Sequence, residues 1–262
     1  MRGAKAKSAP GKAQSSNLRP PGRDGQPEGG PPAADILPAP EISIILPVFN
    51  EAPILAEALS NLPHGPEVEI LLVDGGSVDA TSAVAARFPF ARLVTAPLGR
   101  GAQMNAGARL ARGDILVFLH IDTGLTAAHL TALRQAARHG AHAGAFYLRL
   151  APPTPFLRLI AWGANWRSRL LGLPYGDQAI FLRRDLFCAL GGFARRRPED
   201  LDLVIRLRRF TRLHLLTPPV TSSSRRWLQH GYLKTTGFHW FFLARHLAER
   251  LFTRCWPQQG EL

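Results

Sequence analysis

Three short apolar runs in the first half of the chain each end in a cluster of polar residues. Residues 42–46 lead into PVFNE, residues 69–73 into DGGSVDAT, and residues 115–119 into HID, whose last residue is Asp122. In an open α/β sheet, ligands bind at the carboxyl ends of the strands. The pattern therefore predicts one site built from three loops, with Asp122 as a candidate metal-bridging carboxylate. Such a site is typical of nucleotide-binding enzymes.

Strand and helix signals alternate along this region. Apolar side chains recur at helical spacing in residues 54–62, and Pro53 is tolerated in the first turn of that helix. Further strands are expected at residues 91–95, 144–150 and 179–182, and further helices at residues 101–112 and 126–139. This alternation predicts the α/β class, with a mostly parallel central sheet flanked by helices and joined by right-handed crossovers.

The N-terminal residues and the two cysteines indicate the cellular compartment of the protein. Residues 1–40 have almost no large apolar side chain before Ile36, so we expect a disordered, basic, Pro/Gly-rich tail. The tail has no apolar core of a secretory signal peptide, and no run in the chain reaches the roughly 18 apolar residues of a membrane span. Cys188 and Cys255 form neither a disulfide framework nor a metal-ligand spacing. These features predict a cytoplasmic protein.

The formal net charge of +13 makes nucleic acid, an anionic membrane or a phosphorylated ligand candidate partners. Residues 183–226 contain eleven arginines and no lysine, which suits bidentate recognition of phosphate or carboxylate. A solubilising surface is the plainer interpretation for most of them. Two stretches, residues 152–175 and 238–252, combine Trp, Phe and Leu at helical spacing with arginines. Such helices lie in a membrane interface or pack in a core; core packing is favoured for the first stretch, and both interpretations stay open for the second.

The DGGSVDAT cluster offers candidate ligands for a nucleotide. Its Gly-Gly pair lets the backbone turn sharply and approach a ligand, and Asp74 can accept hydrogen bonds from a base or ribose. Ser77 is a second candidate. A turn in which Asp79 caps a helix that includes residues 84–88 explains Ser77 and Asp79 without a ligand. It does not explain an acid at a buried strand end, so ligand binding is favoured for Asp74 and left open for Asp79.

Four motifs, PVFNE, VDGGSVDAT, GRGAQMNAG (residues 99–107) and FLHID, resemble in their order those of the family 2 glycosyltransferases. The resemblance covers residues 42–227 and implies the A-type nucleotide-diphospho-sugar transferase fold. It also implies that Pro47, Glu51 and Asp74 line the nucleotide pocket. By the same resemblance, Arg100 and Asn105 face the nucleotide-sugar.

The fourth motif is similar to the D-x-D of that family, whose last carboxylate binds a divalent metal on the diphosphate. Only the last position matches, so Asp122 would hold Mn²⁺ or Mg²⁺, which both take oxygen ligands. His120 stands in the first position, and one carboxylate with one imidazole slightly favours manganese. His120 itself either contacts the sugar or is a packed histidine at a strand end.

The segment RPEDLDL (residues 197–203) places three acids at the start of a helix that ends in arginines, which the helix dipole alone would explain. The resemblance instead implies a Glu-Asp pair whose Asp is the general base. Asp200 is therefore assigned as the base, with Glu199 as the alternative. YGDQ (residues 175–178) resembles the acceptor-side loop of the family, which would put Asp177 and Gln178 against the sugar or acceptor.

Residues 223–227, SSRRW, stand where some members of the family carry Q-x-x-R-W. Ser223 takes the Gln position, whereas Arg226 and Trp227 match. Arg226 would stabilise charge on the departing diphosphate, and Trp227 would lie on the acceptor side. The processive polysaccharide synthases that have the full motif also carry transmembrane helices, so polymer synthesis is not expected.

The combined expectation is an inverting glycosyltransferase that moves a sugar from a nucleoside-diphosphate sugar, UDP-linked by preference, to an acceptor hydroxyl or carboxylate. A lipid-borne, isoprenoid- or carotenoid-like acceptor and peripheral contact with the cytoplasmic face of the membrane are candidates. The expected organisation is a tail (1–40), a glycosyltransferase domain (41–232, with halves at 41–125 and 126–232) and an amphipathic C-terminal helix (233–262).

Three other classes of protein are alternatives. A nucleotidyltransferase shares the fold but commonly has a Gly-rich, lysine-containing loop after its first strand, and a dehydrogenase needs G-x-G-x-x-G there; this chain has PVFNE. A non-catalytic protein that binds membrane or nucleic acid explains the charge of the chain but not the acids at the strand ends. No nucleic-acid partner is therefore expected.

Overall fold

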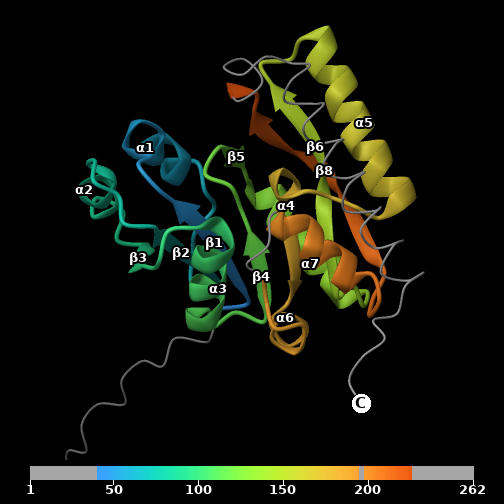
Figure 1. The fold of residues 1–262 in the computed structure, drawn as a ribbon, viewed down its shortest axis with the longest axis horizontal. Helices are drawn as coiled ribbons and strands as arrows, with labels where there is room; N and C mark the ends of the chain where they lie inside the picture. Colours follow the sequence, from blue (N-terminus) through green and yellow to red (C-terminus); the bar gives the residue numbers. More distant parts are fainter. Residues whose placement is uncertain (1–39, 195–197, 226–262) are drawn as a thin grey trace, which may run out of the picture. The chain divides into compact units, whose positions relative to one another are not determined.

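The computed structural model describes residues 40–194 and 198–225 (Figure 1). An eight-stranded sheet in the order β3-β2-β1-β4-β7-β6-β8-β5 forms its centre. The strands are β1 (Ile42–Val48), β2 (Val68–Asp74), β3 (Ala91–Thr95), β4 (Ile115–Phe118), β5 (Thr123–Gly124), β6 (Ala143–Ala151), β7 (Ile180–Arg183) and β8 (Leu213–Ser223). The helices are α1 (Ala52–Ser60), α2 (Thr81–Ala85), α3 (Arg100–Leu110), α4 (Ala127–Arg138), α5 (Pro155–Leu171), the 3₁₀ turn η1 (Gly176–Gln178), α6 (Arg184–Ala189) and α7 (Glu199–Leu207).

The sheet is mixed, and its parallel part carries the polar clusters. Strands β3, β2, β1 and β4 run parallel, so their carboxyl ends meet at one edge (Figure 1). Strand β7 runs antiparallel to β4 and β6, β8 runs parallel to β6, and β5 runs antiparallel to β8. Val48 of β1 pairs with Asp74, and Ile45 pairs with Phe118 of β4. The predicted α/β class and the predicted strands of this region are confirmed.

Helices cover both faces of the parallel strands. Ile44 and Leu46 of β1 pack in one cluster with Leu55 of α1. Ile45, between them, packs in a second cluster with Met104 of α3. Since both faces are buried, these strands are continuous apolar runs rather than alternating ones. This burial on both faces explains why the apolar runs are easily recognised in the sequence.

Strand β8 was not expected, and neither were β5 and α6. Proline lacks the N–H that a strand ladder needs, and Pro218 and Pro219 therefore disfavour a strand assignment. The structure accommodates them in a bulge, because the pairing of β6 with β8 passes from Phe146↔Leu216 directly to Leu148↔Val220. The two prolines lie between the paired stretches.

Helix α5 forms within the predicted aromatic stretch and packs on the sheet, as favoured, but much of its aromatic stripe is exposed. Leu157 and Ala161 pack against Leu148 and Leu150 of β6. Large apolar side chains elsewhere on the helix are exposed, namely Phe156, Leu159, Trp162, Trp166, Leu170 and Leu171. Apolar packing therefore accounts for only part of the helix.

Two other expectations concern parts of the chain outside the described residues. These are the tail, described only at residue 40, and the second aromatic stretch at residues 238–252. Both remain predictions, as do the boundaries of the predicted domain halves. Among the helices of residues 40–194 and 198–225, none is long and apolar enough to cross a membrane.

Candidate active site

The loops that follow β1 and β2 are tied to each other through Asn50 and Ser77. The backbone N–H of Asn50 donates to the Ser77 hydroxyl oxygen at 2.9 Å, and the N–H of Val78 donates to the Asn50 side-chain oxygen at 2.9 Å. Asn50 has a φ of 54°, a left-handed conformation that asparagine adopts more readily than most residues. Asn50 was not among the predicted site residues, although it lies inside the PVFNE motif.

Asp74 closes the turn that follows β2. Its carboxylate is buried, and both oxygens accept the N–H of Ser77 at 3.1 Å. The Ser77 hydroxyl donates to Oδ1 at 2.5 Å. Pro47 lies half-buried in β1, paired with Val73. The predicted nucleotide contacts of Pro47, Asp74 and Ser77 remain predictions, and the structure places all three at the carboxyl edge of the sheet.

Asp79 joins the starts of α2 and α1. Its carboxylate accepts the N–H of Thr81 at 3.0 Å, the Thr81 hydroxyl at 2.5 Å and the N–H of Ala52 at 3.2 Å. The hydrogen bond from the Thr81 hydroxyl is the main cause that lowers the pKa of Asp79 below its ordinary value. The N-cap of α2 is Ala80, so Asp79, the predicted cap, fixes the helix start from one position before the N-cap. These bonds favour the structural interpretation of Asp79.

Gln103 connects α3 to the ends of β1 and β2, from which both loops start. This buried side chain donates from Nε2 to the carbonyl oxygens of Val48 and Val73, each at 2.8 Å. Its Oε1 accepts the N–H of Gly99 at 3.3 Å. One side chain thus holds the ends of β1 and β2 and the start of α3 together. Gln103 was not predicted, and the only signal was a glutamine inside an alanine-rich helix.

Among the ion pairs that connect the predicted nucleotide-binding half with the second half of the chain, two involve the predicted site residues Arg100 and Glu51. Arg100, the first residue of α3, has its Nε 3.6 Å from Oε1 of Glu199, the first residue of α7. Glu51 has its Oε2 3.5 Å from Nη2 of Arg225. Both arginines are partly exposed, so a diphosphate could compete with the carboxylates for them. Arg225 was not predicted; the predicted Arg226 and Trp227 lie outside the described residues.

Asn105 holds a neighbouring loop, and the expectation that Asn105 faces the nucleotide-sugar remains a prediction. Its Nδ2 donates to the carbonyl oxygen of Phe193 at 2.9 Å, and its Oδ1 accepts the N–H of Phe193 at 2.9 Å. Gly192 has a φ of +72°, and a Cβ there would lie 2.5 Å from Asn105 Oδ1. The amide therefore fixes the loop between α6 and α7, which explains the asparagine without a ligand.

His120 and Asp200, which are far apart in the sequence, both lie close to Gly176. His120 follows β4, Gly176 begins η1, and Asp200 lies in the first turn of α7. The N–H of Gly176 donates to Oδ2 of Asp200 at 2.8 Å, and the N–H of Leu201 donates to Oδ1 at 2.8 Å. A Cβ on Gly176 would lie 2.7 Å from His120 Nε2 and 3.2 Å from Asp200 Oδ2. The predicted base and the predicted sugar-side histidine thus lie on either side of a position where only glycine fits.

A half-buried guanidinium lies close to this cluster. The Cζ of Arg167 lies 3.6 Å from the centre of the Tyr175 ring, and its Nε donates to the Leu173 carbonyl oxygen at 2.9 Å. Burial lowers the pKa of Arg167, whereas Tyr175, Asp177 and Asp200 raise it. Burial also raises the pKa of Tyr175. Arg167 therefore places a positive charge where it interacts with both carboxylates of the predicted acceptor side.

Gln178 anchors the η1 loop, and the predicted contact of this residue with the sugar or acceptor remains a prediction. The residue is fully buried. Its Oε1 accepts the Ser168 hydroxyl at 2.7 Å and the Tyr175 N–H at 3.2 Å, and its Nε2 donates to the Phe146 carbonyl oxygen at 2.9 Å. Asp177, the preceding residue, is partly exposed and remains a predicted acceptor contact.

Asp122 follows β4 and is partly exposed. Its backbone oxygen accepts the N–H of Ser223 at 2.9 Å, which ties it to the end of β8. It borders a cavity of about 320 Å³, together with Glu57 of α1 and Arg225. Residues 40–194 and 198–225 contain no group of three or more His, Cys, Asp or Glu side chains that could hold a metal. The predicted role of Asp122 as a ligand of Mn²⁺ or Mg²⁺ remains a prediction, and such an ion would take other ligands from a diphosphate and water.

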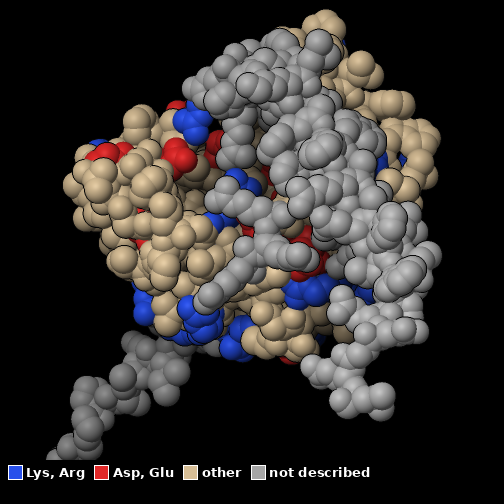
Figure 2. Space-filling view, viewed as in Figure 1, with Lys and Arg blue, Asp and Glu red and all other residues tan. Residues whose placement is uncertain are grey.

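The face of the molecule seen in Figure 2 carries both acidic and basic side chains around a central hollow. A metal–diphosphate ligand needs such a mixture, because carboxylates hold the cation and arginines hold the phosphates. The hollow lies on the face that is toward the viewer in Figure 1, the face on which α3 and α7 lie. Arg100 belongs to α3 and Asp200 belongs to α7.

The chain matches a known family over more than half of its length. The model of glycosyl transferase family 2 matches residues 43–198. A PGL/p-HBAD biosynthesis glycosyltransferase of Mycobacterium bovis is 33% identical over 193 residues, which cover 69% of this chain and 74% of that protein. Glycosyltransferase AglD of Haloferax volcanii is 28% identical over 197 residues, which cover 68% of this chain and 30% of that protein.

Solved structures share the fold. The mannosyltransferase PcManGT from Pyrobaculum calidifontis, in complex with GDP-Man and Mn²⁺, superposes with a TM-score of 0.55 at 23% identity, over 71% of this chain and 57% of that one. TarS 1–349 of S. aureus, in complex with UDP-GlcNAc, gives a TM-score of 0.56 at 17% identity, over 70% of this chain and 58% of that one. At these identities the likeness shows the fold, and it confirms the predicted A-type architecture. The family match and the sequence relatives go further: the chain belongs to glycosyl transferase family 2.

Proposed function

We propose that this protein is an inverting glycosyltransferase that moves a sugar from a nucleoside-diphosphate sugar to an acceptor hydroxyl or carboxylate. UDP-sugars are the first donors to test, and GDP-mannose is the second because a structural relative was solved with it. The observation that carries the proposal is the meeting of Asp200, Gly176 and His120 beside the carboxyl edge of the parallel strands.

In the proposed reaction Asp200 acts as the general base. It takes the proton of the acceptor hydroxyl, and the acceptor oxygen attacks the anomeric carbon from the face opposite the diphosphate. The bond from that carbon to the diphosphate oxygen breaks, and the nucleoside diphosphate leaves with the electron pair. A single displacement of this kind inverts the configuration at the anomeric carbon. Both Asp200 oxygens already accept one backbone N–H, which leaves each a lone pair for the incoming proton.

The departing diphosphate would be held by arginines. Arg100 and Arg225 lie 3.6 Å and 3.5 Å from Glu199 and Glu51, and the predicted Arg226 directly follows Arg225. Planar guanidinium groups match phosphate oxygens in a bidentate geometry. Asp122, with His120 nearby, would hold a divalent cation. When bound, that cation supplies Lewis-acid stabilisation of the diphosphate charge.

The acceptor is proposed to be lipid-borne, and the protein is proposed to act at the cytoplasmic face of a membrane. The exposed apolar side chains of α5 support this assignment, because helices that carry Trp, Leu and Arg on their exposed side suit a membrane interface. The loop that holds Asp177 begins five residues after α5 ends, so the helix and the predicted acceptor contact belong to one segment.

The variants Asp200→Asn and Glu199→Gln test the base assignment together. We expect Asp200→Asn to lower transfer by about 10²- to 10⁴-fold, the usual contribution of a general base, while UDP binding measured by calorimetry stays nearly unchanged. Glu199→Gln releases Arg100 from its ion pair and should keep donor binding and most of the turnover. The opposite pattern would make Glu199 the base. Equal loss of binding and turnover in Asp200→Asn would refute the role of Asp200.

The reaction class is tested with the wild-type protein. A panel of sugar nucleotides with Mn²⁺ and a lipid extract should release a nucleoside diphosphate, measured by coupled assay. Release of pyrophosphate would instead indicate nucleotidyl transfer. Full activity with soluble acceptors and none with lipid would contradict the lipid-borne acceptor while leaving glycosyl transfer intact.

A further inference from the structure

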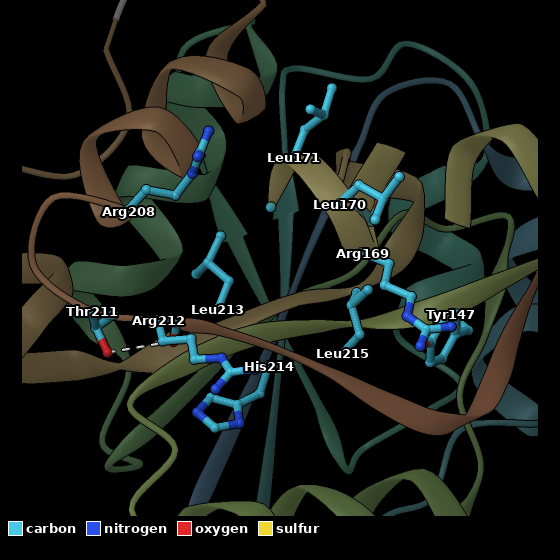
Figure 3. Close-up of a pocket in the computed structure, with 12 residues that line it drawn as sticks. Tyr147, Arg169, Leu170, Leu171, Arg208, Thr211, Arg212, Leu213, His214 and Leu215 are labelled. Carbon is cyan, nitrogen blue, oxygen red and sulfur yellow. Dashed lines mark hydrogen bonds between the residues drawn. The ribbon is translucent and has the colours of Figure 1, made fainter. Parts of the chain in front are cut away.

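A second cavity, of about 480 Å³, lies away from the candidate active site where α5 and α7 end and β8 begins (Figure 3). Leu213 and Leu215 of β8 lie at its centre in that view. Arg169 lies beside Tyr147 on one side, and Arg212 lies beside His214 on another. None of the predicted nucleotide, metal or base residues lines this cavity.

The charge of this cavity is one-sided. Its lining includes Arg169, Arg208, Arg212 and His214 but no Asp or Glu. No ion pair joins the three arginines to any acid in the part of the chain that the structure describes. Arg208 lies against Gly172, where a Cβ would lie 3.3 Å from the Arg208 Nε. Three guanidinium groups around one cavity, without an ion pair among residues 40–194 and 198–225, form a site suited to an anion with several oxygen atoms.

Helix dipoles explain part of this arrangement but not all of it. Arg169 lies in the last turn of α5 and Arg208 directly follows α7, where positive charge is favourable. Arg212 belongs to neither helix, since it directly precedes β8. The dipoles also do not account for a cavity between the arginines. An anionic ligand accounts for both observations.

An exposed apolar surface adjoins the cavity. Leu170 of α5 lines the cavity and is 64% exposed. At helical spacing from it, Trp166, Trp162 and Leu159 are 46%, 58% and 59% exposed. The two tryptophan rings lie 5.5 Å apart. Trp and Arg at the border of an apolar surface are typical of proteins that sit in the headgroup region of a membrane.

We propose that this cavity binds the phosphate of an anionic phospholipid, while Leu159, Trp162, Trp166 and Leu170 lie among the headgroups and upper acyl chains. Charge complementarity favours lipid over the chain's own residues 226–262, which carry five Lys and Arg but two Glu. It also favours lipid over a free anion, because a free anion leaves the apolar surface exposed to water.

The cavity and the predicted base lie at opposite ends of the same helix. Asp200 is in the first turn of α7, and Arg208 directly follows the last residue of that helix. At a rise of 1.5 Å per residue, the two positions are roughly 12 Å apart along the helix axis. A lipid phosphate in the cavity would thus set the distance between the membrane surface and Asp200. This inference rests on the membrane placement in the proposed function and adds the lipid phosphate and its site; vesicle binding is measured without sugar transfer, so the two can fail separately.

Vesicle sedimentation with the full-length protein tests the charge requirement. Wild-type protein should bind vesicles of phosphatidylglycerol and phosphatidylcholine and bind pure phosphatidylcholine far more weakly. The triple variant Arg169→Gln, Arg208→Gln, Arg212→Gln should lose on the order of 100-fold in affinity. The control variant Arg87→Gln, Arg92→Gln, Arg138→Gln removes the same charge from exposed positions on other elements and should change affinity less than threefold. Equal losses in both triple variants would overturn the cavity as the binding site.

Two further measurements complete the test. Trp162→Ser with Trp166→Ser should weaken vesicle binding at least tenfold and abolish the blue shift of tryptophan fluorescence on binding; unchanged binding would overturn the role of α5. Calorimetry with inorganic phosphate separates the sources of the anion. The lipid assignment would be overturned if the wild-type protein binds inorganic phosphate but no vesicles, and if the triple variant of the cavity arginines loses the phosphate binding. Circular dichroism of each variant establishes that it is folded.

Discussion

The carboxylate of Asp200 accepts a hydrogen bond at 2.8 Å from the backbone N–H of Gly176, although the two residues are 24 positions apart. The bond fixes Oδ2, and the N–H of Leu201 fixes Oδ1 in the same way. Because both donors belong to the backbone, the direction of the carboxylate is set by η1 and α7 before any substrate binds. A base held in this way loses little freedom when the acceptor arrives.

Gly176→Ala should therefore lower turnover without lowering stability to the same degree. The new Cβ would lie 2.7 Å from His120 Nε2 and 3.2 Å from Asp200 Oδ2, so one of the two side chains has to move. A displacement of about 1 Å near reacting groups costs on the order of 100-fold in rate. Turnover and UDP binding measured on the same preparation would separate a misplaced base from a damaged donor site.

Gly65→Ala is the matched control for this substitution. A Cβ at residue 65 meets nothing within 4 Å, and the residue is exposed. Turnover of this variant should equal that of the wild type. Wild-type turnover in Gly176→Ala would show that the space beside Asp200 is not critical.

Asp122→Asn should remove the effect of metal on nucleotide binding. In the wild type we expect chelation of divalent cations to weaken UDP affinity, and readdition of Mn²⁺ to restore it. In Asp122→Asn, affinity should be low and insensitive to Mn²⁺, because a neutral amide is a poor ligand for a hard cation. Asp114→Asn is the control, since the Asp114 side chain is 81% exposed beside Arg184. A metal response in Asp122→Asn equal to that of the wild type would rule out Asp122 as the metal ligand.

The positions of Asp74 and Asp122 were predictable because their location follows from the sheet alone. Asp74 is the last residue of β2 and Asp122 lies four positions after the end of β4. Both strands are buried and parallel, and such strands are recognisable as apolar runs. The same argument gave the α/β class. The link between Asp200 and Gly176 was not predicted, since no local pattern relates residues on two separate elements; the family resemblance implied only the role of Asp200.

The contacts that sequence reasoning missed depend on tertiary packing. Arg225 reaches Glu51 across 174 positions of the chain, and Gln103 reaches the ends of two strands from the side of a helix. The burial of Gln178 could not be predicted either, because an amide that is fully buried and one that faces a ligand look alike in a sequence. Helical spacing alone also does not say which side chains of α5 are exposed.

Gln103→Leu should destabilise the fold, since it removes donors from two carbonyl oxygens at the ends of β1 and β2. Val48 also accepts the N–H of Gly75, so part of its hydrogen bonding survives. We expect a loss of about 1–3 kcal/mol in the free energy of unfolding, measured by urea denaturation. Gln135→Leu, at an exposed position of α4, should change this free energy by less than about 0.5 kcal/mol. Equal effects of the two substitutions would contradict the bridging role of Gln103.

His129 makes stability depend on pH. Its Nδ1 accepts the N–H of Thr126 at 3.0 Å, and its Nε2 lies 3.2 Å from the carbonyl oxygen of Pro219. A neutral ring with its proton on Nε2 satisfies both groups. Burial is the main cause that lowers the pKa of His129 below its ordinary value of 6.5. The neutral form is therefore the one that the folded protein favours.

As the pH falls below about 6.5, the unfolded chain takes up a proton at His129 before the folded protein does. The free energy of unfolding should therefore fall between pH 6.5 and the lower pKa of the folded state, and His129 should contribute no slope above pH 6.5. His129→Gln keeps an acceptor for the Thr126 N–H, as in a capping box, and should flatten this part of the profile. Urea denaturation at pH 5.5, 6.5 and 7.5 measures the slope. His139→Gln, at the exposed end of α4, should leave it unchanged, and an undiminished slope in His129→Gln would assign the pH dependence to another group.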